Sequence, residues 1–88
     1  MHSAFVDLII EAYADAAVKY GVPRAQAYAL VAQMVKGSIV LVLKTREQPG
    51  VLKDAVCLPG GTTIRRVCSL EADGFRAGCI HSIDTILE

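Results

Sequence analysis

The sequence predicts an all-α protein of about five helices, and two observations lead to this fold class. Apolar residues recur at helical spacing between proline and glycine breaks. The branched apolar run at residues 39–42 could alone form a strand, but no second strand is available to pair with its backbone. At 88 residues, the chain is expected to form a single domain, residues 1–88.

The first helix is expected over residues 3–20. Asp7, Glu11, Asp15 and Lys19 recur every four residues and form one stripe, which we interpret as a solvated face. Asp15 and Lys19 stand in the favourable acid-before-base order. Apolar residues cover most of the remaining circumference, more than one partner helix would hide. Gly21 is the expected C-terminal cap.

A second helix is expected over residues 24–44, with Pro23 in its first turn. About 20 residues give it a length of about 30 Å. Gly37 and Ser38 interrupt its apolar surface, which predicts either a close helix crossing or a mild kink. A polar connector at residues 45–48 follows.

Three shorter helices complete the predicted fold. One begins at Pro49 and runs to about residue 56. The next follows the glycine-rich segment at residues 58–63, carries Ile64 and Val67 on one side, and ends near residues 73–74. The last runs from Phe75 to the end of the chain, with apolar residues at helical spacing.

The composition is unusually apolar for so small a domain. Hydrophobic residues make up 53% of the chain, charged residues 20%, and the mean hydropathy is +0.44. Residues 25–43 approach the length of a membrane span, but Lys36 would cost at least ~2.5 kcal/mol inside it. Asp7 and Glu11 interrupt any secretory signal. We therefore expect no membrane partner and a second protein chain covering the surplus apolar surface.

Charge and cysteine usage exclude other function classes. The net charge is zero and the pI about 6.7, so nothing attracts nucleic acid or anionic lipid. Cys57, Cys68 and Cys79 lack CxxC spacing, and His2 and His81 add no metal-ligand pattern, so no metal is expected. We interpret the three thiols as buried small hydrophobes in a reducing compartment.

The segment at residues 59–63, Pro-Gly-Gly-Thr-Thr, is the candidate functional site. Gly60 and Gly61 permit positive φ and close approach of a ligand to the backbone. A helix begins there, so its first N–H groups lack acceptors, and Thr62 and Thr63 add hydroxyls. This arrangement suits a carboxylate or phosphate. The alternative that these residues leave open is a plain helix cap made by Thr62 behind a Gly-Gly turn.

Catalytic signals are otherwise sparse. The sequence shows no nucleophile–base pair, and the dinucleotide-binding GxGxxG pattern does not occur. His81 falls in the middle of a predicted helix. The residues alone describe an oligomerising helical domain with one candidate anion site.

Three segments resemble one family, the pyrroline-5-carboxylate reductases. IEAYADAAVKYGVPR (residues 10–24) resembles the opening helix of that family's C-terminal domain. PGGTTI (59–64) is similar to its most characteristic loop, and LEADGFR (70–76) to the segment that follows. The three segments occur in the family's order and at its separations.

The resemblance implies a fold and an activity. The fold would be an interleaved helical dimerisation domain of the 6-phosphogluconate dehydrogenase C-terminal-like class, forming a homodimer or a higher homo-oligomer. The enzymes reduce 1-pyrroline-5-carboxylate to L-proline with NADPH or NADH, which a Rossmann domain outside this chain mainly binds. The implied compartment is the cytoplasm, or alternatively the mitochondrion. The chain alone is expected to be inactive.

The resemblance also assigns roles to residues. Gly60, Gly61, Thr62 and Thr63 would bind substrate, with the N–H groups of Gly61 and Thr62 holding its carboxylate. The Thr63 hydroxyl would reach toward the ring nitrogen and act as the catalytic group. The family normally has serine before the proline, whereas this chain has Leu58. The lost hydrogen bond to a charged group should weaken binding by roughly 1.5–3 kcal/mol.

A second departure lies at the beginning of the chain. The family usually enters the first helix through a Ser-Gly-Pro-Ala segment, of which only Ala4 remains, behind Met1, His2 and Ser3. Together with Leu58, this leaves an alternative open: a degenerate, non-catalytic helical oligomerisation module.

Overall fold

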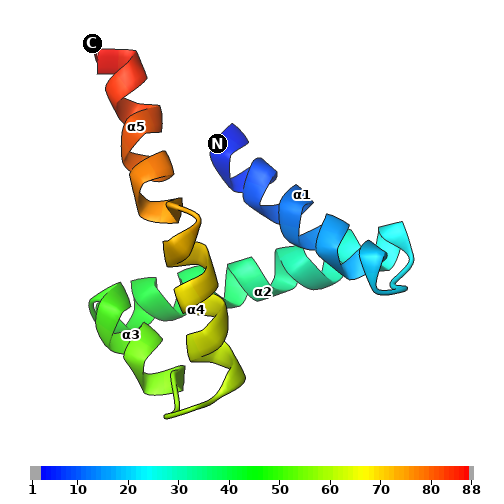
Figure 1. Ribbon diagram of the computed structural model, residues 1–88, viewed down its shortest axis with the longest axis horizontal. Coiled ribbons are helices and arrows are strands. Elements are labelled where there is room, and N and C mark those ends of the chain that lie inside the picture. The colour runs from blue at the N-terminus through cyan, green and yellow to red at the C-terminus, as the bar shows by residue number, and fades with distance from the viewer. Residues whose placement is uncertain (1–2, 88) are drawn as a thin grey trace. The chain divides into compact units, whose positions relative to one another are not determined.

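The computed structural model describes residues 3–87, so the predictions for Met1 and His2 lie outside the described residues. Its helices are α1 (Ala4–Lys19), α2 (Arg24–Thr45), α3 (Pro49–Val56), α4 (Thr62–Ala72) and α5 (Phe75–Leu87), shown in Figure 1. Residues 3–87 contain no strand, which confirms the predicted all-α class. The helices fall into two compact units, one holding α1 and α2 and the other α3, α4 and α5.

Helix α1 is bounded by the signals that its sequence carries. The Ser3 hydroxyl accepts a hydrogen bond from the Phe5 N–H at 3.2 Å and caps the start. Gly21 adopts φ 103°, and its N–H donates to the Val18 carbonyl at 3.0 Å. The Val22 N–H donates to the Ala17 carbonyl at 3.1 Å, which completes a Schellman motif. The predicted glycine cap is confirmed.

Helix α2 runs without interruption through Gly37 and Ser38. Pro23 lies one residue before the helix rather than in its first turn, and its carbonyl accepts from the Ala27 N–H at 2.9 Å. A Cβ placed on Gly37 would meet nothing within 4 Å, so no close helix crossing occurs there among the described residues. The helix extends to Thr45, beyond the predicted end, and closes where Arg46 adopts φ 57°.

The α1–α2 hairpin contains the core of its unit. Ala14 and Ala27 are fully buried and Val31 is 6% exposed. Small side chains at Ala14 and Ala27 allow the two helix backbones to pack closely. Partly buried apolar residues surround this core: Ile10, Ala17, Val18, Val22 and Val35.

A surface ion pair also joins the two helices of the hairpin. Arg24, in the first turn of α2, donates a hydrogen bond from Nη1 to Oδ1 of Asp15. Asp15 therefore pairs with Arg24 across the turn, and the Lys19 Nζ lies 5.5 Å from the centroid of the Tyr20 ring. The hydrogen bond to Asp15 raises the pKa of the Arg24 guanidinium further above its ordinary value.

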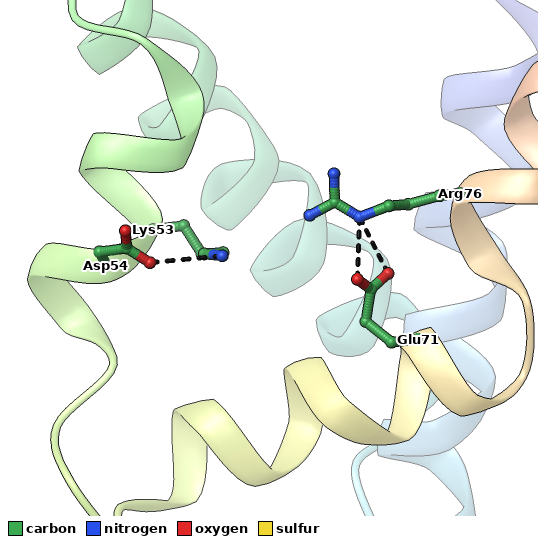
Figure 2. Close-up of polar contacts among 4 residues, drawn as sticks. All are labelled: Lys53, Asp54, Glu71 and Arg76. Atoms are coloured by element: carbon green, nitrogen blue, oxygen red, sulfur yellow. Dashed lines mark hydrogen bonds and ion pairs between the residues drawn. The ribbon is translucent and has the colours of Figure 1, made fainter.

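Turns and an ion pair connect the helices of the second unit. Pro49 occupies the first turn of α3, as predicted. Gly74, with φ 76°, separates α4 from α5, and its N–H donates to the Glu71 carbonyl at 3.1 Å. The Arg76 Nε donates to both carboxylate oxygens of Glu71 at 2.9 Å and bridges this turn (Figure 2).

No residue of α3, α4 or the described part of α5 is buried. Large apolar side chains are exposed throughout this unit: Val51, Val56, Leu58, Phe75, Ile80, Ile83, Ile86 and Leu87. Cys57 is half-buried, whereas Cys68 and Cys79 are exposed, so the predicted burial of these two thiols is wrong for the single chain. Within the described residues, these large apolar side chains of the second unit lie without cover.

Helix α2 is the one helix of the described residues long and apolar enough to cross a membrane. This statement rests on length and composition alone, and 11% of its apolar window is buried.

Candidate anion site at the start of helix α4

The two glycines of the predicted site lie in one tight turn, directly before the helix that holds Thr62 and Thr63. The Gly61 N–H donates to the Leu58 carbonyl at 2.9 Å, with Pro59 second in the turn and Gly60 third. Gly60 adopts φ 69°. Proline followed by a residue of positive φ is the signature of a type II turn, which explains the first glycine.

A different cause explains why the second residue of the pair, Gly61, is glycine. Gly61 adopts φ −78° and ψ 172°, which any residue can adopt. A Cβ at this position would lie 3.1 Å from the Leu58 carbonyl oxygen and 3.5 Å from the Leu58 Cβ. Space, rather than conformational freedom, therefore favours glycine here.

Helix α4 begins directly after this turn with an uncapped end. Gly61 is the N-cap residue and Thr62 the first residue of the helix, so the alternative that Thr62 caps the helix is wrong. No side chain caps the start, and no acidic residue lies in the first turn. The N–H groups of Thr62, Thr63 and Ile64 have no acceptor one helical turn earlier, and they carry the positive end of the helix dipole.

The hydroxyls at this end of α4 complete the arrangement. Thr62 is exposed and Thr63 half-buried, and neither hydroxyl forms a hydrogen bond with another group of residues 3–87. Leu58 directs no polar group to the site, since its side chain is apolar and its carbonyl accepts from Gly61. Arg65 and Arg66, both exposed, follow on the same helix and add positive charge nearby.

Sequence reasoning missed one feature of this site. It assigned the Gly61 N–H to ligand binding, but in the structure that N–H closes the turn. The signal was present, because a Pro-Gly pair at the two central turn positions predicts a hydrogen bond from the following residue. The open donors are therefore the N–H groups of Thr62, Thr63 and Ile64.

The other candidate residues of the sequence, the three cysteines and His81, lie in the described residues as well. No group of three or more His, Cys, Asp or Glu side chains in residues 3–87 is placed to hold a metal ion. His81 is exposed on α5. The chemistry that the turn supports is binding of an anion by backbone N–H groups and hydroxyls.

Fold and turn together define an all-helical assembly domain with a candidate anion site. The family described as "Pyrroline-5-carboxylate reductase dimerisation" matches residues 1–88, and the chain belongs to this family. Similar proteins include the pyrroline-5-carboxylate reductases of Escherichia coli (strain K12), 56% identical over 97% of this chain, and Treponema pallidum (strain Nichols), 46% identical over 96%. The chain covers 32% of each, so it spans about a third of the length of these relatives.

Solved structures of the same family are similar to this chain. The 1-pyrroline-5-carboxylate reductase from Streptococcus pyogenes matches 93% of this chain with TM-score 0.90 and 40% identity. The pyrroline carboxylate reductase of Plasmodium falciparum, solved with NADP bound, matches 93% with TM-score 0.89 and 36% identity. The chain covers 32% and 31% of these two proteins.

Proposed function

We propose that this chain is the dimerisation and substrate-binding part of an NAD(P)H-dependent reductase that converts 1-pyrroline-5-carboxylate to L-proline. The family match over residues 1–88 carries the proposal. The uncapped start of α4 supports it, because a substrate with a carboxylate needs an anion site of this kind.

The partner in this proposal is a second copy of the chain, in an interleaved homodimer or a higher homo-oligomer. Large apolar side chains exposed on both units support it, because burial of such side chains contributes about 1.5–3 kcal/mol each. The proposed compartment is the cytoplasm, or the mitochondrion.

At the site, the N–H groups of Thr62 and Thr63 bind the carboxylate, and the turn at Gly60 and Gly61 leaves room for it. The Thr63 hydroxyl faces the ring nitrogen and helps to place the proton that this nitrogen gains as the C=N bond is reduced. NADPH or NADH supplies the hydride when bound, and residues outside this chain mainly hold it. The contribution of residues 59–63 is to fix the orientation of the substrate.

Activity of a chimera tests the proposal. The C-terminal third of the Escherichia coli relative is replaced by this chain, and assembly is checked by light scattering. Substrate-dependent oxidation of NADPH is expected, and Thr63→Val should lower kcat/KM by about a hundredfold. Thr85→Val, a matched change on α5, should leave it unchanged. A correctly assembled chimera without activity would contradict the proposal. The 88-residue chain alone is expected to oxidise no NADPH.

The second candidate function is a non-catalytic oligomerisation module, which Leu58 favours. Leu58→Ser in the chimera distinguishes the two. If the site binds substrate, the added hydroxyl should lower KM about tenfold or more. If the site is vestigial, neither the parent chimera nor its Leu58→Ser variant will reduce the substrate.

A further inference from the structure

We propose that Gly61 is a positioning residue of this site rather than a ligand donor, an inference that rests on the proposed function. Its missing side chain lets the turn from Leu58 close against the start of α4. The closed turn fixes where the N–H groups of Thr62 and Thr63 lie.

The spacing at Gly61 differs from that at every other glycine of the described chain. A Cβ at Gly61 would approach the carbonyl oxygen, Cβ and carbonyl carbon of Leu58 to 3.1, 3.5 and 3.8 Å. A Cβ at any of the other six would meet nothing within 4 Å: Gly21, Gly37, Gly50, Gly60, Gly74 and Gly78. Among the described glycines, only Gly61 has another residue within 4 Å of the position a Cβ would take, and that residue is the first of its own turn.

The contact concerns the same carbonyl that holds the turn together. The Leu58 oxygen accepts from the Gly61 N–H at 2.9 Å, and the Cβ of any larger residue would press on that oxygen. Relief of the contact requires the carbonyl to move by a few tenths of an ångström, and this movement loosens the hydrogen bond. Since Thr62 follows directly, its N–H and that of Thr63 shift with the turn.

Displaced donors should affect carboxylate binding more than the reaction itself. In the chimera, Gly61→Ala should raise KM about tenfold and leave kcat within about twofold. It should also reduce the preference of the site for L-proline over L-prolinamide, which lacks the negative charge. Gly50→Ala, the same change on α3 in open space, should alter neither quantity. Melting temperature and solution mass verify folding and assembly.

A second comparison separates positioning from a general effect on the fold. Gly61→Ala is repeated in a Leu58→Gly background, where the 3.5 Å contact with the Leu58 Cβ is lost and the carbonyl, whose oxygen still lies 3.1 Å from the new Cβ, is freer to move. The rise in KM should shrink in that background. A rise of the same size, or an unchanged KM and proline preference in the single variant, would overturn the positioning role. An inactive parent chimera would instead overturn the proposed function.

Discussion

The two units of the chain differ in how much of their apolar surface they bury. The α1–α2 hairpin has three buried residues, Ala14, Ala27 and Val31, whereas α3, α4 and α5 have none among the described residues. Both units expose large apolar side chains. The first unit therefore has a small core of its own, and the second depends on cover from outside the chain.

The difference follows from helix length and from small residues. α1 and α2 have 16 and 22 residues, and alanines at their contact let them pack along one another. α3 has 8 residues and α4 has 11, lengths at which a helix is marginal without tertiary packing. Covering the second unit with another copy of the chain would supply that packing.

The largest effect is expected from a charge on the exposed apolar surface of α5. Ile80 is 61% exposed in the single chain, so Ile80→Asp would be nearly neutral if this side stayed in water. If a second copy covers it, the unpaired buried charge should cost several kcal/mol and dissociate the oligomer. Light scattering at micromolar concentration measures the outcome. His81→Asp, one position along the same helix, serves as the control and should assemble.

Overpacking of the hairpin core should come next. Ala27 is fully buried between α1 and α2, so Ala27→Leu should lower the free energy of unfolding by about 1–3 kcal/mol. Ala25→Leu, at an exposed position of the same helix, should change it by about 0.5 kcal/mol or less. Urea unfolding followed by circular dichroism gives both values. Equal effects of the two substitutions would show that the hairpin has no core of its own.

Two glycine substitutions test whether a second copy of the chain packs against α2 at Gly37. Gly21→Ala should destabilise by about 1–2 kcal/mol, because φ 103° strains any L side chain. Gly37→Ala lies in open helix and should stabilise by about 0.5–1 kcal/mol. Thermal melts compare the two variants. Loss of stability in Gly37→Ala would place a helix of a second copy at this position.

The smallest effect is expected at the surface ion pair of the hairpin. Asp15 and Arg24 are both substantially exposed, with side-chain exposures of 59% and 46%. Asp15→Asn should lower the melting temperature less than Gly21→Ala does, and salt should diminish the difference. A double-mutant cycle with Arg24→Gln isolates the pair. A larger effect than that of Gly21→Ala would mean that a partner chain buries this pair.

The fold was predictable from the sequence because the residues that begin and end its helices act locally. Gly21, Pro49 and Gly74 end or begin helices by their own backbone preferences, and no distant contact is needed to identify them. The close helix crossing predicted at Gly37 is absent among the described residues, because a crossing depends on where another helix packs and helical spacing does not specify that. Pairings across a turn, such as Asp15 with Arg24, depend on the angle between helices, which helical spacing alone does not specify.

The candidate site was predictable in position but not in detail. The Pro-Gly-Gly-Thr-Thr segment identifies the turn and the helix start, and both are present. Which N–H remains open depends on the hydrogen bond from Gly61 to Leu58 and on a 3.1 Å approach that only coordinates reveal. The exposure of Cys68 and Cys79 was missed because an apolar neighbourhood in sequence was read as burial within one chain.

The solution mass of this chain, measured by light scattering at micromolar concentration without detergent, shows most directly whether a second copy covers the exposed apolar surface. A stable species of about twice 9.4 kDa, or a multiple of it, is the predicted result, because the second unit has no core of its own. A well-folded monomer of about 9.4 kDa would contradict the claim that a second copy covers the exposed apolar surface.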